Sequence, residues 1–179
     1  FGQEIYFQTI KTLLKNAAGQ YRNESLVKSI LPAVQNKGYY GSGRYVSVDK
    51  ATALKGFSVT PNWQPNDKAE TRARFVHVPV LEANQPGASF SFTFTGNAAG
   101  IAIVAGPDAG MIKYSVDGKP DKVMDLYTQW SGGLHLPWYL VLADGLPKGK
   151  HILKVQITAQ KNKDSKGNAC RIVYFLANE

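Results

Sequence analysis

Several features that would narrow the function are scarce in this sequence. It has one cysteine, so no disulfide can form within the chain. It has no run of about 18 apolar residues, which argues against a helical membrane span. It contains three histidines and no Gly-Asp-Ser block, which leaves little for an acyl-transfer site. With 179 residues and an apolar fraction of 44%, the chain is long enough for one domain with a short appendage.

The single thiol, Cys170, lies in the apolar stretch 169–175, which has the pattern of a buried strand. We therefore expect an inert core thiol there rather than a nucleophile. The formal net charge is +8, and part of it gathers in the segment 161–166. No basic helix or zinc-ligand spacing accompanies this charge, so nucleic acid is not expected as a partner. An acidic polysaccharide or another anionic surface stays open.

The first residue is Phe1 rather than methionine, and it already lies in an apolar periodic run. Tyr6, Ile10 and Leu13 share one face at helical spacing, which predicts a helix over 1–18 that stops at Gly19. A chain that opens inside a helix is expected to be a piece of a longer protein. A second short helix is expected over 23–31, since Pro32 would end it. We place the domain boundary after residue 37, giving a helical segment 1–37 and a β domain 38–179.

Short strand-like segments separated by turns fill the rest of the sequence. They are expected at 44–49, 55–60, 74–80, 88–95, 100–105, 111–117, 122–127, 134–142, 151–158 and 170–176. Phe90, Phe92 and Phe94 alternate with Ser and Thr, as a strand with one buried face requires. The pair 117–118, Asp-Gly, predicts a tight hairpin. The predicted fold class is mainly β: a jelly-roll-like antiparallel β-sandwich preceded by two short helices.

The residues that could carry catalysis are sparse. His77 and His151 lie between apolar neighbours and are expected to be structural, whereas His135 lies near a loop. A complete catalytic triad within the chain is not expected. Asp117, Asp121 and Asp125 recur every four residues, which permits a structural calcium, but aspartates in turns commonly bond their own backbone. We predict no catalytic residue, no metal and no cofactor.

Aromatic residues in or next to loops suggest a sugar-binding surface, because flat rings can stack on the C–H face of a pyranose while polar side chains bind its hydroxyls. The expected ligand contacts are Trp63, Trp130, Trp138, His135 and Asp108. The alternative is that these tryptophans belong to the core or a lid.

Two stretches of the sequence resemble one enzyme family. Residues 1–10, FGQEIYFQTI, resemble the last helix of SGNH/GDSL hydrolases. Residues 87–176 resemble the β-sandwich appended to some bacterial SGNH-type esterases of carbohydrate metabolism. This second likeness rests on the Phe-x-Phe-x-Phe-x-Gly run 90–96, on AGPDAG at 105–110, on YSVDG at 114–118 and on LADGLP-x-G-x-H at 142–151.

The resemblance implies a parent GDSL-like lipase or acylhydrolase of the carbohydrate esterase type, with this chain as its C-terminal accessory domain. None of the family's catalytic blocks has a matching position here, so no catalytic residue carries over. The implied function is to bind or orient a carbohydrate for the chain's own hydrolase domain, in the periplasm or after secretion. The alternative is a structural buttress that binds nothing.

Overall fold

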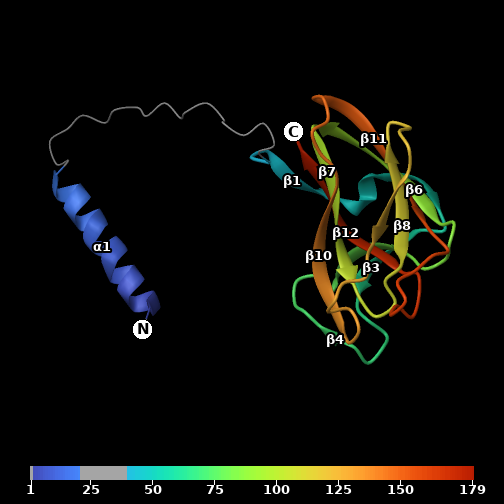
Figure 1. The fold of residues 1–179 in the computed structure, drawn as a ribbon, viewed down its shortest axis with the longest axis horizontal. Helices are drawn as coiled ribbons and strands as arrows, with labels where there is room; N and C mark the ends of the chain where they lie inside the picture. The colour runs from blue at the N-terminus through green and yellow to red at the C-terminus, as the bar shows by residue number, and fades with distance from the viewer. Residues whose placement is uncertain (1, 21–39) are drawn as a thin grey trace. The chain divides into compact units, whose positions relative to one another are not determined.

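The computed structural model describes residues 2–20 and 40–179 (Figure 1). The chain divides into two compact units, Phe1–Gln35 and Asn36–Glu179. In the described part of the first unit the α-helix α1 spans Gly2–Gln20, close to the helix expected over 1–18. The second expected helix, 23–31, lies outside the described residues, so the two-helix part of the predicted fold is supported for one helix. No helix in the described parts is long and apolar enough to cross a membrane.

The second unit consists of two sheets that face each other and are antiparallel except where β4 pairs with β10, which confirms the predicted β-sandwich (Figure 1). The larger sheet has the order β3-β5-β12-β7-β10-β4, with β1 also paired to β12, and the smaller has the order β2-β6-β11-β8-β9. Their bounds are β1 Gly43–Ser47, β2 Ala51–Lys55, β3 Ser58–Trp63, β4 Glu70–Thr71, β5 Val78–Ala83, β6 Ser89–Gly96, β7 Ala98–Ala105, β8 Met111–Val116, β9 Lys122–Asp125, β10 Leu134–Ala143, β11 Gly149–Ile157 and β12 Cys170–Asn178. A short 3-10 helix, Val48–Lys50, connects β1 to β2.

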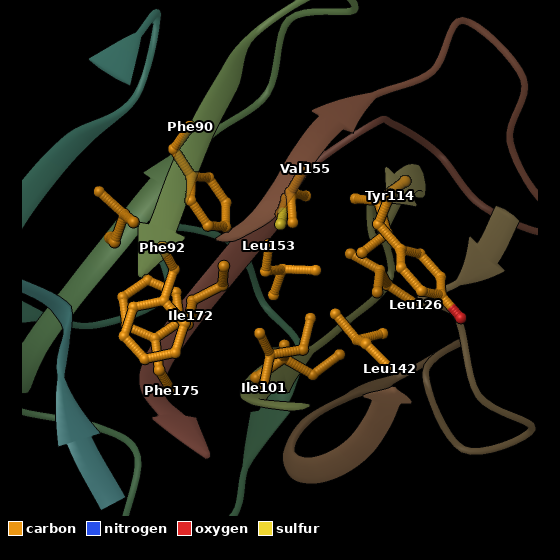
Figure 2. Packing of buried hydrophobic residues seen from close by; sticks show 14 of the residues in the cluster. Phe90, Phe92, Ile101, Tyr114, Leu126, Leu142, Leu153, Val155, Ile172 and Phe175 are labelled. Atoms are coloured by element: carbon orange, nitrogen blue, oxygen red, sulfur yellow. The ribbon is translucent and has the colours of Figure 1, made fainter. Parts of the chain in front are cut away.

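Alternating side chains on facing strands build the core between the sheets. On β6, Phe90, Phe92 and Phe94 are buried while the serines and threonines between them point away, as the sequence pattern predicts. Phe92 stacks on Phe175 of β12, with ring centroids 4.1 Å apart (Figure 2). Burying each such ring stabilises the fold by about 1.5–3 kcal/mol before entropy is counted.

The central strands of the larger sheet are buried on both faces. Every residue of β7 is buried, because the segment 64–77 covers part of the face that points away from the smaller sheet. We call this the outer face. A second apolar cluster forms there around Trp63, Phe75 and Val173. Cys170 of β12 is fully buried, and burial raises the pKa of its thiol to about 12, which confirms the inert core thiol.

The turns hold the smaller sheet in register. Asp117 and Gly118 both have positive φ, 54° and 70°, and form the predicted hairpin between β8 and β9. Asp117 also accepts a hydrogen bond from His151 Nδ1 at 2.6 Å, while His151 Nε2 lies 2.8 Å from the Pro147 carbonyl oxygen. The bond to Asp117 and then that to Pro147 raise the pKa of His151 above its ordinary value, and both partners fit the expected structural role. His77, expected within a strand, instead lies in the bend before β5 with φ 59°.

Candidate functional site

A pocket of about 580 Å³ opens on the outer face of the larger sheet, beside the segment that follows β3. We call it the polar pocket, because most of its lining side chains carry hydrogen-bonding groups. These are Ser58, Thr60, Asn62, Gln64, Asn66, Glu82, Asn84, Asp108 and Arg171, together with Trp63. They come from β3 and the loop after it, from the end of β5, from the β7–β8 turn and from β12. Four separate parts of the chain therefore meet in one place.

Arg171 organises the base of the polar pocket. It alternates along β12 with core residues, so its side chain projects onto the outer face. Its two terminal nitrogens donate to both oxygens of Asp108, at 2.7 and 2.6 Å, in a bidentate pair. Its Nε lies 3.5 Å from a carboxylate oxygen of Glu82, and that N–H has no hydrogen-bond acceptor. The other carboxylate oxygen of Glu82 accepts a hydrogen bond from Thr60 Oγ1.

Burial and pairing act in opposite directions on these groups. Burial alone would raise the pKa of Asp108, but the hydrogen bonds and positive charge of Arg171 outweigh it and hold that pKa below its ordinary value. Burial likewise opposes the charge of Arg171, whereas the bonds to Asp108 raise its pKa. Both groups therefore stay charged at neutral pH, and each is held by the other.

Trp63 forms one wall of the polar pocket, with its ring only 4% exposed. The guanidinium of Arg171 lies over this ring, 5.4 Å from its centroid, in a cation–π contact. His135 is another neighbour of the ring, with its centroid 5.6 Å away in an edge-on arrangement. Trp63 is thus held between Arg171, His135 and the apolar cluster of the outer face.

His135 lies behind Trp63 and is 2% exposed. Its Nε2–H donates to the carboxylate of Asp67, at 3.0 and 3.1 Å from the two oxygens, while its Nδ1 has no partner. Burial raises the pKa of Asp67, but the bond from His135 outweighs it and the pKa is lowered. A Cβ at Gly106 would lie 2.3 Å from His135 Nδ1, so this position needs glycine. The pair fastens the segment 64–77 to β10.

The five residues expected as ligand contacts separate into two groups. Trp63 and Asp108 line the polar pocket, and His135 supports Trp63 from behind. Trp130, 58% exposed in the β9–β10 loop, and Trp138, 39% exposed on β10, do not line it. The structure therefore brings three of the five together and leaves two apart. A purely structural sandwich would have all three tryptophans buried, whereas Trp130 and Trp138 are exposed.

Sequence reasoning missed Arg171, Glu82 and the amide side chains of the polar pocket. One signal was available, because an arginine inside the apolar stretch 169–175 must find an acceptor when the strand is buried. No signal identified the acceptor, since Asp108 lies 63 residues earlier in the chain. Asn62, Asn66 and Asn84 carry no pattern that separates them from ordinary loop residues.

A second hollow, of about 310 Å³, lies on the outer face where β1 and β10 flank β12 and β7. We call it the tyrosine hollow, because Tyr40, Tyr45 and Tyr139 line it, all of them about half exposed. Tyr45 and Tyr139 have ring centroids 6.4 Å apart, and Phe75 packs 5.9 Å from Tyr139. The rest of the lining is mainly Ala, Gly, Val and Leu, so this hollow is largely apolar.

The described histidines bond partners other than serine, and no cluster of metal-ligating side chains lies near them. None of the three hydrogen-bonds a serine hydroxyl; the partners are Asn62, Asp67, and Asp117 with Pro147. In the parts of the chain that the structure describes, no three His, Cys, Asp or Glu side chains gather in a way that would hold a metal ion. The polar pocket offers paired charges, amides and hydroxyls, groups that can exchange hydrogen bonds with hydroxyl groups.

No protein-family model and no curated protein sequence matches this chain. Solved structures do resemble it. A two-domain esterase active on acetylated mannans matches 96% of this chain with a TM-score of 0.61 and 14% identity. A family 35 carbohydrate binding module from Clostridium thermocellum matches 76% of the chain with a TM-score of 0.51 and 13% identity.

The extent of the match differs between these two proteins. The match covers 46% of the length of the esterase and 97% of the length of the binding module. At these identities the likeness shows a shared fold. The β-sandwich is thus a fold that occurs both as a module by itself and as part of a longer esterase.

Proposed function

We propose that residues 38–179 form a jelly-roll-like, non-catalytic accessory domain that binds or orients a carbohydrate for an adjoining SGNH/GDSL-type esterase domain. The observation that carries the proposal is the polar pocket, where amides, hydroxyls and paired charges converge beside Trp63. The fold shared with a carbohydrate binding module and with an esterase active on acetylated mannans supports it. This function places the protein in the periplasm or outside the cell.

The advantage of such a domain would be local concentration. A module that holds a polysaccharide keeps acyl groups near the linked enzyme, so each encounter becomes effectively intramolecular. The polar pocket suits this task because Arg171, Asp108 and Glu82 are already held in place by one another. Little conformational entropy is then lost when a sugar binds.

Calorimetric titration of the chain with manno-oligosaccharides, plain and acetylated, tests the proposal. The double variant Asn66→Ala with Asn84→Ala removes two lining amides for which no internal hydrogen bond is seen, so affinity should fall about tenfold while the fold is kept. Gln160→Ala removes an exposed amide outside the pocket and serves as the control. Flat titrations of the wild-type chain across plain and acetylated glycans would refute carbohydrate binding.

The alternative is a structural buttress with no ligand, and the tyrosine hollow is the observation that favours it. Exposed rings on an apolar floor suit contact with another protein domain as well as with a sugar. If the chain binds no glycan, the buttress remains. A structural buttress predicts that Tyr45→Ala lowers the stability of the longer protein but leaves the stability of the isolated chain nearly unchanged.

A further inference from the structure

The net charge of the chain and the charge of the polar pocket have opposite signs. The whole sequence carries a formal charge of +8, which by itself would favour an acidic polysaccharide. Among the described residues, only Arg171, Asp108 and Glu82 bring formal charges to the pocket lining. One guanidinium against two carboxylates leaves the lining with a single negative charge. The lysines that make the chain basic do not line it.

Arg171 is also not available to a ligand carboxylate. Its two terminal nitrogens already bind both oxygens of Asp108, and the face of its guanidinium rests on Trp63. The remaining Nε–H points toward Glu82 at 3.5 Å, a distance too long for a hydrogen bond. The Nε atom itself is buried out of a ligand's reach, and a carboxylate bound at this end of the pocket would lie near the Glu82 carboxylate. The repulsion would act in a partly buried site, where solvent screens charge poorly.

A neutral hydroxyl group has no such conflict. It can donate its proton to the Glu82 carboxylate, whose side chain is 28% exposed at the pocket, without placing a second negative charge there. Hydrogen bonds to charged partners are stronger than those between neutral groups. The amides of Asn62 and Asn84 offer both donors and acceptors to the neighbouring hydroxyls.

We propose that the polar pocket selects neutral hexopyranosides and rejects uronates, with Glu82 as the residue that sets this preference. The inference rests on the proposed function and specifies its ligand class. It predicts that the basic surface of the chain does not determine which sugar occupies the pocket.

A matched pair of ligands isolates the charge. β-1,4-linked mannohexaose and β-1,4-linked mannuronic acid hexamer share their linkage and ring stereochemistry and differ at C6, where one has a CH₂OH group and the other a carboxylate. We expect the neutral hexamer to bind the wild-type chain about tenfold more tightly or better, because like charges at close range oppose the acidic one. Affinity for the neutral hexamer should change little with added salt.

Glu82→Gln then tests the role of the residue. Glutamine still accepts from Thr60 but removes the negative charge next to Arg171, so the preference for the neutral hexamer should shrink several-fold. Asp121→Asn removes one negative charge from an exposed position in the β8–β9 loop and should leave the preference unchanged. Thermal unfolding of both variants confirms that they remain folded.

The outcomes separate the two proposals. If the mannuronate hexamer binds the wild-type chain as tightly as the neutral one, the pocket is not selective for neutral sugars, although carbohydrate binding stands. If Glu82→Gln and Asp121→Asn give the same preference as the wild-type chain, Glu82 does not set it and the inference fails. If neither hexamer binds, the proposed function and this inference fail together.

Discussion

The polar pocket and the tyrosine hollow lie on the same face of the same sheet, and β12 contributes to both. At the polar pocket β12 presents Arg171, whose charge is bound by carboxylates from two other parts of the chain. At the tyrosine hollow the same strand contributes Leu176, and the rings of Tyr45 and Tyr139 pack there at a tilt without a hydrogen-bonded charge pair. Hydrogen bonds between charged groups hold the polar pocket together, whereas non-directional apolar contacts hold the tyrosine hollow together.

The two regions should therefore respond differently to substitution. Removing one member of a charge network leaves its partners buried and unpaired. Removing one exposed ring leaves a gap that water can fill. Stability should thus depend strongly on the polar pocket and weakly on the tyrosine hollow, even where both bind a ligand.

The largest effect is expected from Arg171→Met. The change leaves Asp108 and Glu82 without their cation, so the free energy of unfolding should fall by about 3–5 kcal/mol. Urea unfolding measures it. Arg44→Met removes a mostly exposed arginine that pairs with Glu179 and should cost less than about 1 kcal/mol. Equal losses in the two variants would contradict the network interpretation.

Gly106→Ala should have the next largest effect. The new methyl group would overlap His135 Nδ1, so His135 must move away from Asp67 and Trp63. We expect a loss of about 1–3 kcal/mol, together with weaker glycan binding, because Trp63 loses its support. Gly133→Ala, where a Cβ meets nothing within 4 Å, is the matched control. Unchanged glycan binding in Gly106→Ala would show that His135 does not position the pocket wall.

Tyr139→Ala tests the other region. Tyr139 is 48% exposed and packs against Tyr45 and Phe75, so its loss should cost about 1 kcal/mol. Urea unfolding again gives the value. A loss as large as that of Arg171→Met would mean that the tyrosine hollow belongs to the structural core of the domain.

The smallest expected effect is the change of the free energy of unfolding with pH, which differs between the two regions. The folded pKa of Asp108 lies below the ordinary value of 3.8, so its pairing stabilises the fold above that value and is lost as the pH falls through the folded pKa. The contribution of this pair to the stability of the wild-type chain should therefore be lost as the pH falls below about 3.8, and this loss should be smaller in Arg171→Met. An acid loss of the same size in both proteins would contradict this assignment.

The tyrosine hollow should respond at the opposite end of the pH range. The Tyr45 hydroxyl, with burial, raises the pKa of Tyr139 above 10.0, so this contribution is present below that value and is lost as the pH rises through the folded pKa. Tyr139→Phe should remove this part of the alkaline loss. Urea unfolding at increasing alkaline pH measures it.

Local sequence patterns predicted the parts of the fold that depend on neighbouring residues. The alternation around Phe92 and the Asp117-Gly118 turn were readable because a strand face and a tight hairpin are set within a few positions. The candidate site was only partly readable, because it depends on which strands become neighbours. Asp108 and Trp63 stood out by their residue types, but the sequence does not show that Arg171 joins them.

The buried thiol of Cys170 can be used to measure local unfolding of the protein. The side chain lies on β12 between β5 and β7, is fully shielded from solvent and has a pKa of about 12. A thiol reagent can reach it only when the strand separates from the sheet, so the labelling rate reports how often that opening occurs. Because the sequence has no other cysteine, this reaction measures the rate of opening in each variant without an added probe.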